Sequence, residues 1–511
     1  MSPLDRGGRP AWLRTTAYTL LLVAITVAVR MPLLVRDHAI DDEVNYSVVA
    51  RQLIDGEVLY RGIVERRPPA TFWVYAAVFR MFGEANWFAL HAAATVWVLL
   101  TLLALYVIGT RLFDARTGYL AALLYGVLQP WWYWGNLAFN GEVLMNLPVA
   151  AAFAVCLAAD RFRTARFAVA GALISAAFML KQPAAIAIVA LCVYALHPDR
   201  ARRFGLSMQQ RIVDLFSLAT GSITVVAVTA LWLYTRSVLQ EAVYWSVLDH
   251  GVPYIFWDKA VERTLAFVAV GFPVLAAACY STAVVDRWRR HRAERDTLVC
   301  LLVVSAIGAA ASGRFYPHYY IGVLPPLCVL AAAAASRVTF ASTSRSRWVR
   351  GIAIAWIVSA VVLTAVNQWV VGAREPERSE SALYIRAHSK PDDRVFVWGR
   401  MPRVYLDSDR RPASRYIDTF ALTGRIFGPS LKGIDTSARI VPGSWDQLRE
   451  DFEDHPPTFI VDADSRDQAE YPVENFPWLA ELLRKDYIAV ALAVDGVIYR
   501  RRSAASSRAS E

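Results

Sequence analysis

The chain has 511 residues, of which 56% are hydrophobic and 19% are charged. Ordinary globular domains have roughly 45–50% apolar and about 25% charged residues, so this composition argues against a soluble globular protein. The formal net charge of +10 does not indicate nucleic-acid binding, because most arginines fall between apolar runs, where they act as orientation signals in membrane proteins. We therefore expect a membrane protein that binds no nucleic acid.

Apolar runs follow one another from Ala11 to Gly372 and are separated by short charged clusters. Each run approaches the roughly 20 residues that a helix needs to cross a bilayer. The pattern predicts a mainly α, polytopic helical membrane protein with about eleven transmembrane helices. The expected spans are residues 15–34, 87–110, 118–134, 142–159, 166–180, 184–196, 212–235, 264–285, 297–312, 319–336 and 351–371.

The distribution of arginine predicts the orientation of these spans. Arginines gather in alternate loops, for example Arg111 and Arg116, then Arg161 and Arg163. The positive-inside rule places these loops and the N-terminus in the cytoplasm of a multi-pass cell membrane protein. With an odd number of spans, the loop at residues 36–86 and everything after Gly372 are expected outside.

The pattern changes after the last span, so we expect a transmembrane domain at 1–371 and a small extracytoplasmic α/β domain at 372–502. Helices are predicted at 377–388 and 445–452, strands at 394–398 and 458–462, and a hairpin at 487–500 turning at Asp495-Gly496. Residues 503–511 are predicted to be a disordered tail. The soluble part carries no phosphate loop, nucleophile elbow or metal cluster, which favours a supporting or acceptor-recognition role.

The first outer loop carries the strongest candidates for chemistry. Asp41, Asp42 and Glu43 open a segment with helical spacing that is too charged to span, so we expect it to lie along the membrane interface. Further along, Glu65, Arg66 and Arg67 precede two prolines. Guanidinium groups bind phosphates, and an ionised acid can take a proton from a hydroxyl, so the loop could bind a phosphate and activate a hydroxyl. A solvated, salt-bridged loop would explain the same spacing.

Two other places offer candidates near the membrane edge. Lys181 separates two apolar runs and is either a snorkelling lysine or a cation for an anionic lipid headgroup. Arg314 and His318 are four residues apart and are expected on one face, followed by Tyr319 and Tyr320. A structural role for the histidine is the alternative.

Together these features resemble the GT-C superfamily of lipid-phosphate-dependent membrane glycosyltransferases, in particular the bacterial branch related to protein O-mannosyltransferases and the lipid A aminoarabinose transferase. The motif of that branch after its first span is matched in order by Asp42-Glu43, Tyr46, Ala50, Leu53, Gly56 and Tyr60. Its next motif, an acid followed by lysine and two prolines, is matched by Glu65 and Arg67-Pro68-Pro69, with arginine in place of lysine. Glu142, Lys181 and the stretch Pro317-His318-Tyr319 are softer matches.

The resemblance implies an enzyme that moves a hexose or pentose from a polyprenyl-phosphate donor to an acceptor hydroxyl on the outer face, with inversion. Asp42 would be the general base, with Asp41 as a rival because the acidic run allows a shift of one residue, and Glu43 would support the base. The donor phosphate would be bound by Arg66, Arg67, Lys181 and Arg314. Substrate contacts would come from Tyr46, Tyr60, Glu65, Glu142, His318 and Tyr319.

Other interpretations remain open at this point. The resemblance implies no certain cofactor and leaves a divalent metal open, and the acceptor could be a lipid, a polysaccharide or a protein. A transporter or flippase of lipid-linked sugars is the alternative function, although transporters usually show internal repeats and polar midplane sites. A non-catalytic membrane scaffold that presents the C-terminal domain is the third interpretation.

Overall fold

The computed structural model describes residues 11–36, 41–131, 133–157, 162–248, 255–284, 286–340, 344–372, 379–425, 435–464 and 470–502. The chain forms two compact units. The first unit contains Met1–Ala39, Trp87–Thr229 and Trp257–Arg374. The second unit contains Ile40–Asn86, Ala230–Phe256 and Glu375–Glu511. The predicted tail at 503–511 lies outside the described residues.

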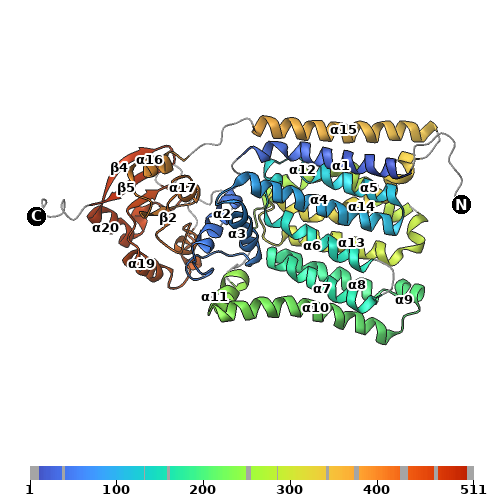
Figure 1. Cartoon of the computed structure of the whole chain (residues 1–511), viewed down its shortest axis with the longest axis horizontal. Coiled ribbons are helices and arrows are strands. Elements are labelled where there is room, and N and C mark those ends of the chain that lie inside the picture. Colours follow the sequence, from blue (N-terminus) through green and yellow to red (C-terminus); the bar gives the residue numbers. More distant parts are fainter. Residues whose placement is uncertain are drawn as a thin grey trace, which may run out of the picture. The chain divides into compact units, whose positions relative to one another are not determined.

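The first unit is a bundle of helices, and its long helices run side by side (Figure 1). Short 3₁₀ turns η1 (Trp134–Leu137), η2 (Gln182–Ala187) and η5 (Pro317–Val323) interrupt the bundle. The helices are α1 (Ala11–Leu34), α4 (Trp87–Leu112), α5 (Ala115–Leu128), α6 (Gly141–Cys156), α7 (Arg163–Leu180), α8 (Ile188–Leu196), α9 (Pro198–Phe204), most of α10 (Met208–Thr235), α12 (Trp257–Val284), α13 (Arg292–Ala310), α14 (Leu324–Phe340) and α15 (Ser344–Gly372).

Each of the eleven predicted spans falls on a helix, but fewer helices are fit to cross a membrane. Among the described residues, six helices are long and apolar enough, and the pair Gln182–Leu196 and Pro198–Phe204, bent by 49°, would make a seventh. The six are Thr15–Leu34, Trp87–Leu112, Arg163–Leu180, Met208–Thr235, Trp257–Ala283 and Pro317–Ser336. The prediction of a polytopic helical membrane protein is confirmed, and the prediction of about eleven spans is not met by this measure.

The shortfall has physical causes in individual helices. α5 has 14 residues, a length of about 21 Å, which is less than the hydrocarbon core of about 30 Å. The first turns of α13 are charged, with Arg292, Glu294, Arg295 and Asp296. α6 and the segment Ile354–Val366 of α15 are apolar but short. Apolar runs in the sequence therefore predicted where the helices lie, but they did not predict which helices are long and apolar enough to cross a membrane.

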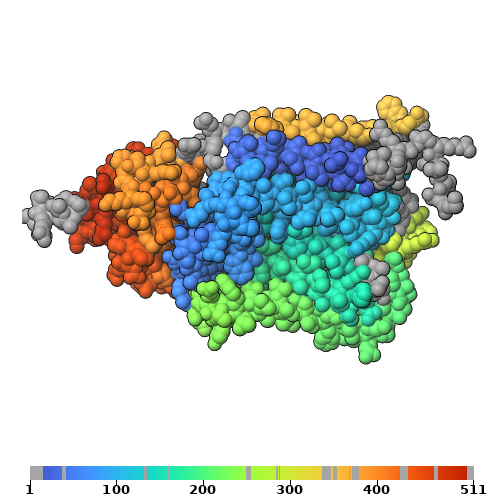
Figure 2. Space-filling view, viewed as in Figure 1, coloured from blue at the N-terminus to red at the C-terminus, as the bar shows by residue number. Residues whose placement is uncertain are grey.

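Outward-facing apolar side chains show that the bundle suits a lipid environment. α10 forms the green surface in Figure 2, and its Phe216, Ile223, Val228 and Leu231 are all exposed. Such a row would be costly in water but is favourable in a bilayer, where the surroundings are as apolar as the side chains.

Polar clamps hold the bundle together internally. Arg30 of α1 is 1% exposed and donates to Thr95 Oγ1 (3.2 Å), Gln129 Oε1 (3.0 Å) and the Leu137 carbonyl (2.6 Å). These bonds join α1 to α4, to the residue that follows α5 and to η1, and they supply the acceptors that a buried guanidinium requires.

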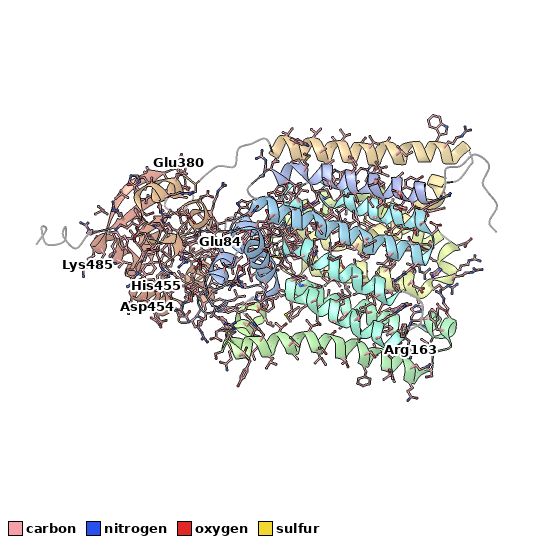
Figure 3. The ribbon with its side chains drawn as sticks, in the orientation of Figure 1. Glu84, Arg163, Glu380, Asp454, His455 and Lys485 are labelled. Carbon is pink, nitrogen blue, oxygen red and sulfur yellow. The ribbon has the colours of Figure 1, made fainter. Side chains whose placement is uncertain are left out.

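A second clamp joins three helices through one buried acid. Asp214 of α10 accepts from Arg163 of α7 at 2.7 Å and from Arg200 of α9 at 2.8 Å. Arg163 is labelled in Figure 3. Because Asp214 is fully buried, two guanidinium partners are the kind of compensation that its charge needs.

The second unit contains a five-stranded sheet with the order β2-β1-β3-β5-β4. The strands are β1 (Arg394–Trp398), β2 (Arg411–Pro412), β3 (Phe459–Asp462), β4 (Tyr487–Ala493) and β5 (Gly496–Arg501). β1 pairs in parallel with β2 and β3, whereas β5 is antiparallel to β3 and β4. The helices are α16 (Glu380–His388), α17 (Arg403–Asp407), α18 (Phe420–Thr423), α19 (Ser444–Asp454) and α20 (Pro477–Asp486). The predicted strands, helices and hairpin of this part are thus confirmed.

The segment Ile40–Asn86, which contains most of the predicted first outer loop, belongs to this same unit. It supplies α2 (Asp41–Ile54) and α3 (Ala70–Phe82), and the unit also takes in α11 (Leu239–Val243) and the π-helical turn η3 (Tyr244–Leu248). α2 packs against α3 and α17. α2 is packed inside the protein: Val44, Val48, Val49 and Ala50 are each at most 2% exposed, and Glu43 is 0% exposed. That α2 lies along the membrane interface stays a prediction.

Candidate functional site

A single arginine connects the two acidic motifs of the first outer loop. Arg67 donates through Nη2 to Asp42 Oδ1 at 3.2 Å and through Nη1 to the Glu65 oxygens at 2.9 and 3.2 Å. Asp42 stands in the first turn of α2, and Pro68-Pro69 lead directly into α3. The side chains of Arg67 and Asp42 are 24% and 16% exposed. Both are therefore mostly buried but still accessible from outside the protein. The predicted association of acids and arginines in this loop is therefore present.

Glu65 accepts several hydrogen bonds in this group. It is 7% exposed and accepts from the backbone N–H of Arg66 at 2.9 Å in addition to the bonds from Arg67. A nearly buried carboxylate requires such donors because its desolvation would otherwise be costly. Glu65 thus fixes the backbone at Arg66 and the guanidinium of Arg67 together.

Aromatic side chains surround the arginine. The Arg67 guanidinium lies 4.8 Å from the centre of the Tyr46 ring, and Tyr46 itself meets Phe72 and Tyr75 edge-on at 5.8 and 5.4 Å. Stacking on a ring holds a guanidinium while its N–H donors remain directed outward in its own plane. Tyr46, predicted as a substrate contact, therefore also supports Arg67.

Tyr60 holds the backbone of the same arginine. Its hydroxyl donates to the Arg67 carbonyl at 2.8 Å, and its backbone adopts a φ of 72°, a left-handed conformation that is uncommon for residues other than glycine. Burial raises the pKa of the Tyr60 phenol well above its ordinary value, so the hydroxyl stays protonated and acts as a donor.

Of the two candidate bases, the structure describes the side chain of Asp42. Asp42 is joined to Arg67, and Glu43 is buried next to it in α2. The side chain of Asp41 lies outside the described residues, so its rivalry with Asp42 stays a prediction.

The other predicted residues form a group in the first unit. Lys181 Nζ pairs with Glu142 Oε1 and lies 5.0 Å from the centre of the Tyr319 ring. Asn140 caps α6 by accepting from the Val143 N–H at 3.1 Å. A Cβ at Gly141 would come within 2.5 Å of Lys181 Cδ, so the glycine makes room for the lysine. The structure thus brings three predicted residues together: Glu142, Lys181 and Tyr319.

This group holds polar atoms that the described residues leave without a hydrogen bond. They are Glu142 Oε2 and Asn140 Nδ2, both buried. Buried polar atoms normally find a partner. One acceptor and one donor beside a lysine are suited to a polar ligand group.

His318 lies among aromatic rings. It is 7% exposed, stacks on Tyr316 and Tyr133 at 5.6 and 6.5 Å, and meets Tyr319 edge-on at 4.8 Å. The prediction that Arg314 shares a helical face with it is wrong, because Arg314 precedes η5 and is not in a helix. The Arg314 carbonyl instead accepts from Arg263 at 2.9 Å.

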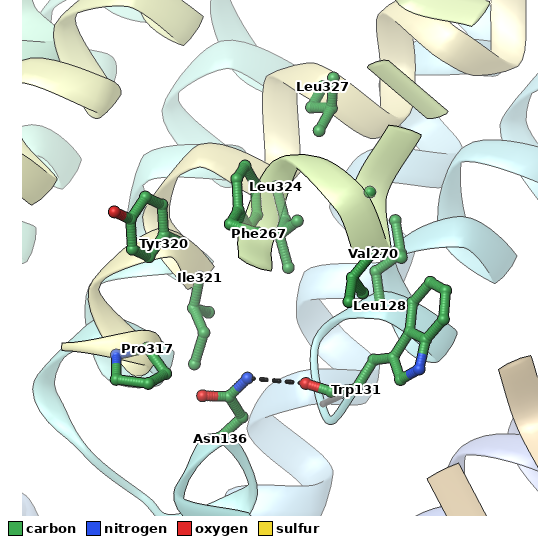
Figure 4. A pocket seen from close by; sticks show the side chains of 11 residues that line it. Leu128, Trp131, Asn136, Phe267, Val270, Pro317, Tyr320, Ile321, Leu324 and Leu327 are labelled. Carbon is green, nitrogen blue, oxygen red and sulfur yellow. Dashed lines mark hydrogen bonds between the residues drawn. The ribbon is translucent and has the colours of Figure 1, made fainter. Parts of the chain in front are cut away.

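The described part of the first unit also has an apolar pocket (Figure 4). Trp131, Phe267, Tyr320 and Leu324 are among its lining residues, and Asn136 is its one amide. Asn136 donates to the Trp131 carbonyl at 3.0 Å. Pro317 and Tyr320, from the stretch singled out in the sequence, line this pocket, whereas none of the predicted acids and cations does. Its walls therefore offer apolar contact rather than acid–base chemistry.

Metal ligation was left open by the sequence. Within the described ranges, no three His, Cys, Asp or Glu side chains are grouped so that they could hold a metal ion. The side chain of Asp41 lies outside the described part of the structure.

Sequence reasoning missed the residues of the C-terminal part that reach the loop. The Arg66 guanidinium lies 3.9 Å from the centre of the Phe420 ring, and buried Asp418 interacts electrostatically with Glu65 and Arg66. No motif or spacing marks Asp418 and Phe420, because they meet the loop only through folding.

Comparison with known proteins agrees with the fold. The family model for dolichyl-phosphate-mannose-protein mannosyltransferase matches residues 66–232. A curated relative, the undecaprenyl phosphate-α-4-amino-4-deoxy-L-arabinose arabinosyl transferase of Pseudomonas savastanoi pv. phaseolicola, is 26% identical over 255 residues. That match covers 48% of this chain and 44% of the relative, so the chain matches less than half of the relative's length.

Solved structures resemble nearly the whole chain. ArnT from Cupriavidus metallidurans bound to undecaprenyl phosphate gives a TM-score of 0.62 at 15% identity, covering 96% of this chain and 99% of that one. The archaeal oligosaccharyltransferase AglB from Archaeoglobus fulgidus, in complex with an inhibitory peptide and a dolichol-phosphate, gives 0.59 at 14% identity, covering 96% and 75%. With the family match, these likenesses confirm the predicted resemblance to the GT-C superfamily of membrane glycosyltransferases. The protein is thus a multi-pass membrane protein whose fold resembles those of ArnT and AglB.

Proposed function

We propose that the protein is an integral membrane glycosyltransferase that moves a sugar from a polyprenyl-phosphate donor to an acceptor hydroxyl on the outer face of the cell membrane. The relatives support the donor class, because one is an undecaprenyl phosphate-sugar transferase and two solved relatives contain undecaprenyl phosphate or dolichol-phosphate. The acceptor is a lipid, a polysaccharide or a protein.

The observation that carries the proposal is the bridge from Asp42 through Arg67 to Glu65. Breaking a sugar–phosphate bond builds negative charge on the leaving phosphate, and guanidinium groups aimed at that charge stabilise the transition state. The attacking hydroxyl must lose a proton, for which a fixed carboxylate is suited. The loop holds both kinds of group in one cluster.

In the proposed reaction Asp42 takes the proton from the acceptor hydroxyl as its oxygen attacks the anomeric carbon. The carbon–oxygen bond to phosphate breaks on the opposite side, which inverts the configuration, and the electron pair leaves with the polyprenyl phosphate. A phosphate leaving group needs no proton from an acid, so one base and several cations are enough. Arg66, Arg67, Lys181 and Arg314 are the proposed cations, and Glu43 and Glu65 hold the base and the arginine in place.

The remaining predicted residues have supporting roles in this proposal. Tyr46 and Tyr60 contact Arg67 directly, so they shape the side of the site near the phosphate. Glu142, His318 and Tyr319 are proposed as contacts to the donor in the first unit, where Glu142 and Tyr319 already contact Lys181.

The substitution Asp42→Asn tests the proposed base. Removal of a general base is expected to lower sugar transfer by about 100-fold or more, while the amide can still accept a hydrogen bond from Arg67. The measurement is transfer of labelled sugar by membranes that contain equal amounts of full-length wild type or variant. Asp446→Asn in α19 is the matched control, because its side chain is 82% exposed, and it should behave as wild type.

Three outcomes distinguish the alternatives. Full activity of Asp42→Asn would contradict its role, and loss of activity only in Asp41→Asn would move the base by one residue. If the labelled lipid instead crosses the membrane with its sugar still attached, in wild type and variant alike, the protein is a transporter of lipid-linked sugars.

A further inference from the structure

The C-terminal part of the chain contacts the first outer loop at the residues that carry its charge. The Val64 N–H donates to the Arg415 carbonyl at 2.9 Å, which fixes the loop backbone just before Glu65. Both segments belong to the second unit, although they are far apart in the sequence. The position of the loop arginines therefore depends on residues around 415–420.

Phe420 is the main side-chain contact at this junction. The Arg66 guanidinium stacks on its ring at 3.9 Å, and Trp245 packs edge-on against the same ring at 6.2 Å. Phe420 is 5% exposed, so the contact is largely desolvated, where a cation–π interaction is strongest. The Phe420 ring covers one face of the Arg66 guanidinium. The N–H donors that would bind a phosphate lie in the plane of the guanidinium, so the ring does not block them.

The segment that carries Phe420 is itself anchored. Arg415 pairs with Asp451 of α19 through Nε at 2.9 Å and Nη2 at 2.7 Å. Asp418, 6% exposed, accepts from the Phe420 N–H at 3.1 Å and interacts with both Glu65 and Arg66. These contacts fix the position of the Phe420 ring. A residue that positions another side chain must itself be held in place in this way.

We propose that Phe420 of the C-terminal domain is a positioning residue for the donor phosphate, which it orients by holding the guanidinium of Arg66. The proposal rests on the proposed function and deepens it, because it makes the C-terminal domain part of the donor site rather than a passive appendage. Asp418 and Arg415 serve the same purpose by fixing the segment beneath the ring.

Phe420→Leu tests the proposal, because leucine keeps much of the apolar volume and removes the aromatic face. We expect binding of undecaprenyl phosphate to the purified full chain to weaken about tenfold, and KM for the sugar donor to rise similarly with KM for the acceptor unchanged. Phe420→Tyr retains the aromatic face and should restore both values.

Phe452→Leu is the matched control from the same unit. Phe452 is also nearly buried and packs on Phe396 and Trp478 at 5.0 and 5.8 Å. This variant should bind undecaprenyl phosphate as the wild type does, even if it is less stable.

The outcomes separate this proposal from the proposed function. Unchanged binding by Phe420→Leu, equal weakening by Phe452→Leu, or failure of Phe420→Tyr to restore binding would overturn the positioning role. A wild type that binds undecaprenyl phosphate but transfers no sugar would contradict the proposed reaction, and the binding comparison would still decide the role of Phe420.

Discussion

At the scale of single residues, local sequence and long-range folding contributed different parts of the site. Asp42, Glu65 and Arg67 were predictable because they lie in one loop with charges of opposite sign and two prolines that fix its direction. Phe420 and Asp418 were not, since an aromatic residue and an acid in an unpatterned segment give no sign of what they will contact.

Asp418 provides a prediction about pH. Burial, and then the charge of Glu65, raise the pKa of Asp418 from 3.8 to about 6. The folded state therefore favours the protonated acid, so the stabilisation is complete below the unfolded-state pKa and is lost as pH rises towards 6. Asp418→Asn cannot ionise, while its amide oxygen can keep the bond from the Phe420 N–H.

Relative to wild type, the variant should thus gain about 2 kcal/mol of stability as the pH rises from about 4.5 to about 7.5. Tm values of the purified full chain at the two pH values measure this difference. Besides Glu65, the charges that act on Asp418 are Arg66 and Arg400, and they oppose the shift. A difference in Tm that is the same at both pH values would show that Asp418 does not titrate as described.

At the scale of elements, apolar runs and turn residues located most helices and strands. The strand at 394–398 has the predicted bounds, and the hairpin turns at Val494-Asp495, one residue before the predicted turn, because alternation and turn chemistry are local properties. The packing of α2 against α3 and α17 was not predictable, because it depends on parts of the chain that no local pattern includes. The helix at 115–128 was expected to be longer, since an apolar run continues past its end.

Close contact between α7 and α10 gives a prediction at this scale. A Cβ at Gly171 would collide with the Leu218 carbonyl oxygen, and one at Gly221 with the Ala168 carbonyl oxygen. Ser222 Oγ donates to the Gly171 carbonyl at 3.1 Å across the same contact. Small residues at such crossings allow helices in membranes to approach closely.

Gly171→Ala should therefore force the two helices apart and cost about 1–3 kcal/mol of stability. Thermal unfolding of the detergent-solubilised full chain would register this as a lower Tm. Gly351→Ala in α15 is the control, because a Cβ there would meet nothing within 4 Å. Equal Tm values for Gly171→Ala and the control would refute the close approach.

At the scale of the whole molecule, composition alone predicted a multi-pass membrane protein. The sequence predicted two domains with a boundary near residue 372, and that boundary stays a prediction. In the structure the segment Ile40–Asn86 of the first outer loop shares a unit with the sheet. Sidedness was inferred only from the arginines, and it stays a prediction.

Cysteine labelling tests the sidedness. Val494, in the hairpin turn, is 64% exposed, and Val494→Cys is expected to react with an impermeant thiol reagent added to intact cells. Arg202 lies in α9, in an arginine-rich stretch predicted to be cytoplasmic, and its side chain is 78% exposed. Arg202→Cys should react only after lysis, and the opposite pattern would invert the topology.

The most direct test of the proposed function follows the sugar itself. The purified full chain is incubated with undecaprenyl phosphate carrying labelled pentoses or hexoses, together with lipids, polysaccharide and peptides from cell envelopes. We predict that one label moves to an acceptor as free undecaprenyl phosphate accumulates in equal amount, with inverted configuration at the anomeric carbon. If every labelled donor remains intact with a folded wild-type protein, the proposed sugar transfer is contradicted.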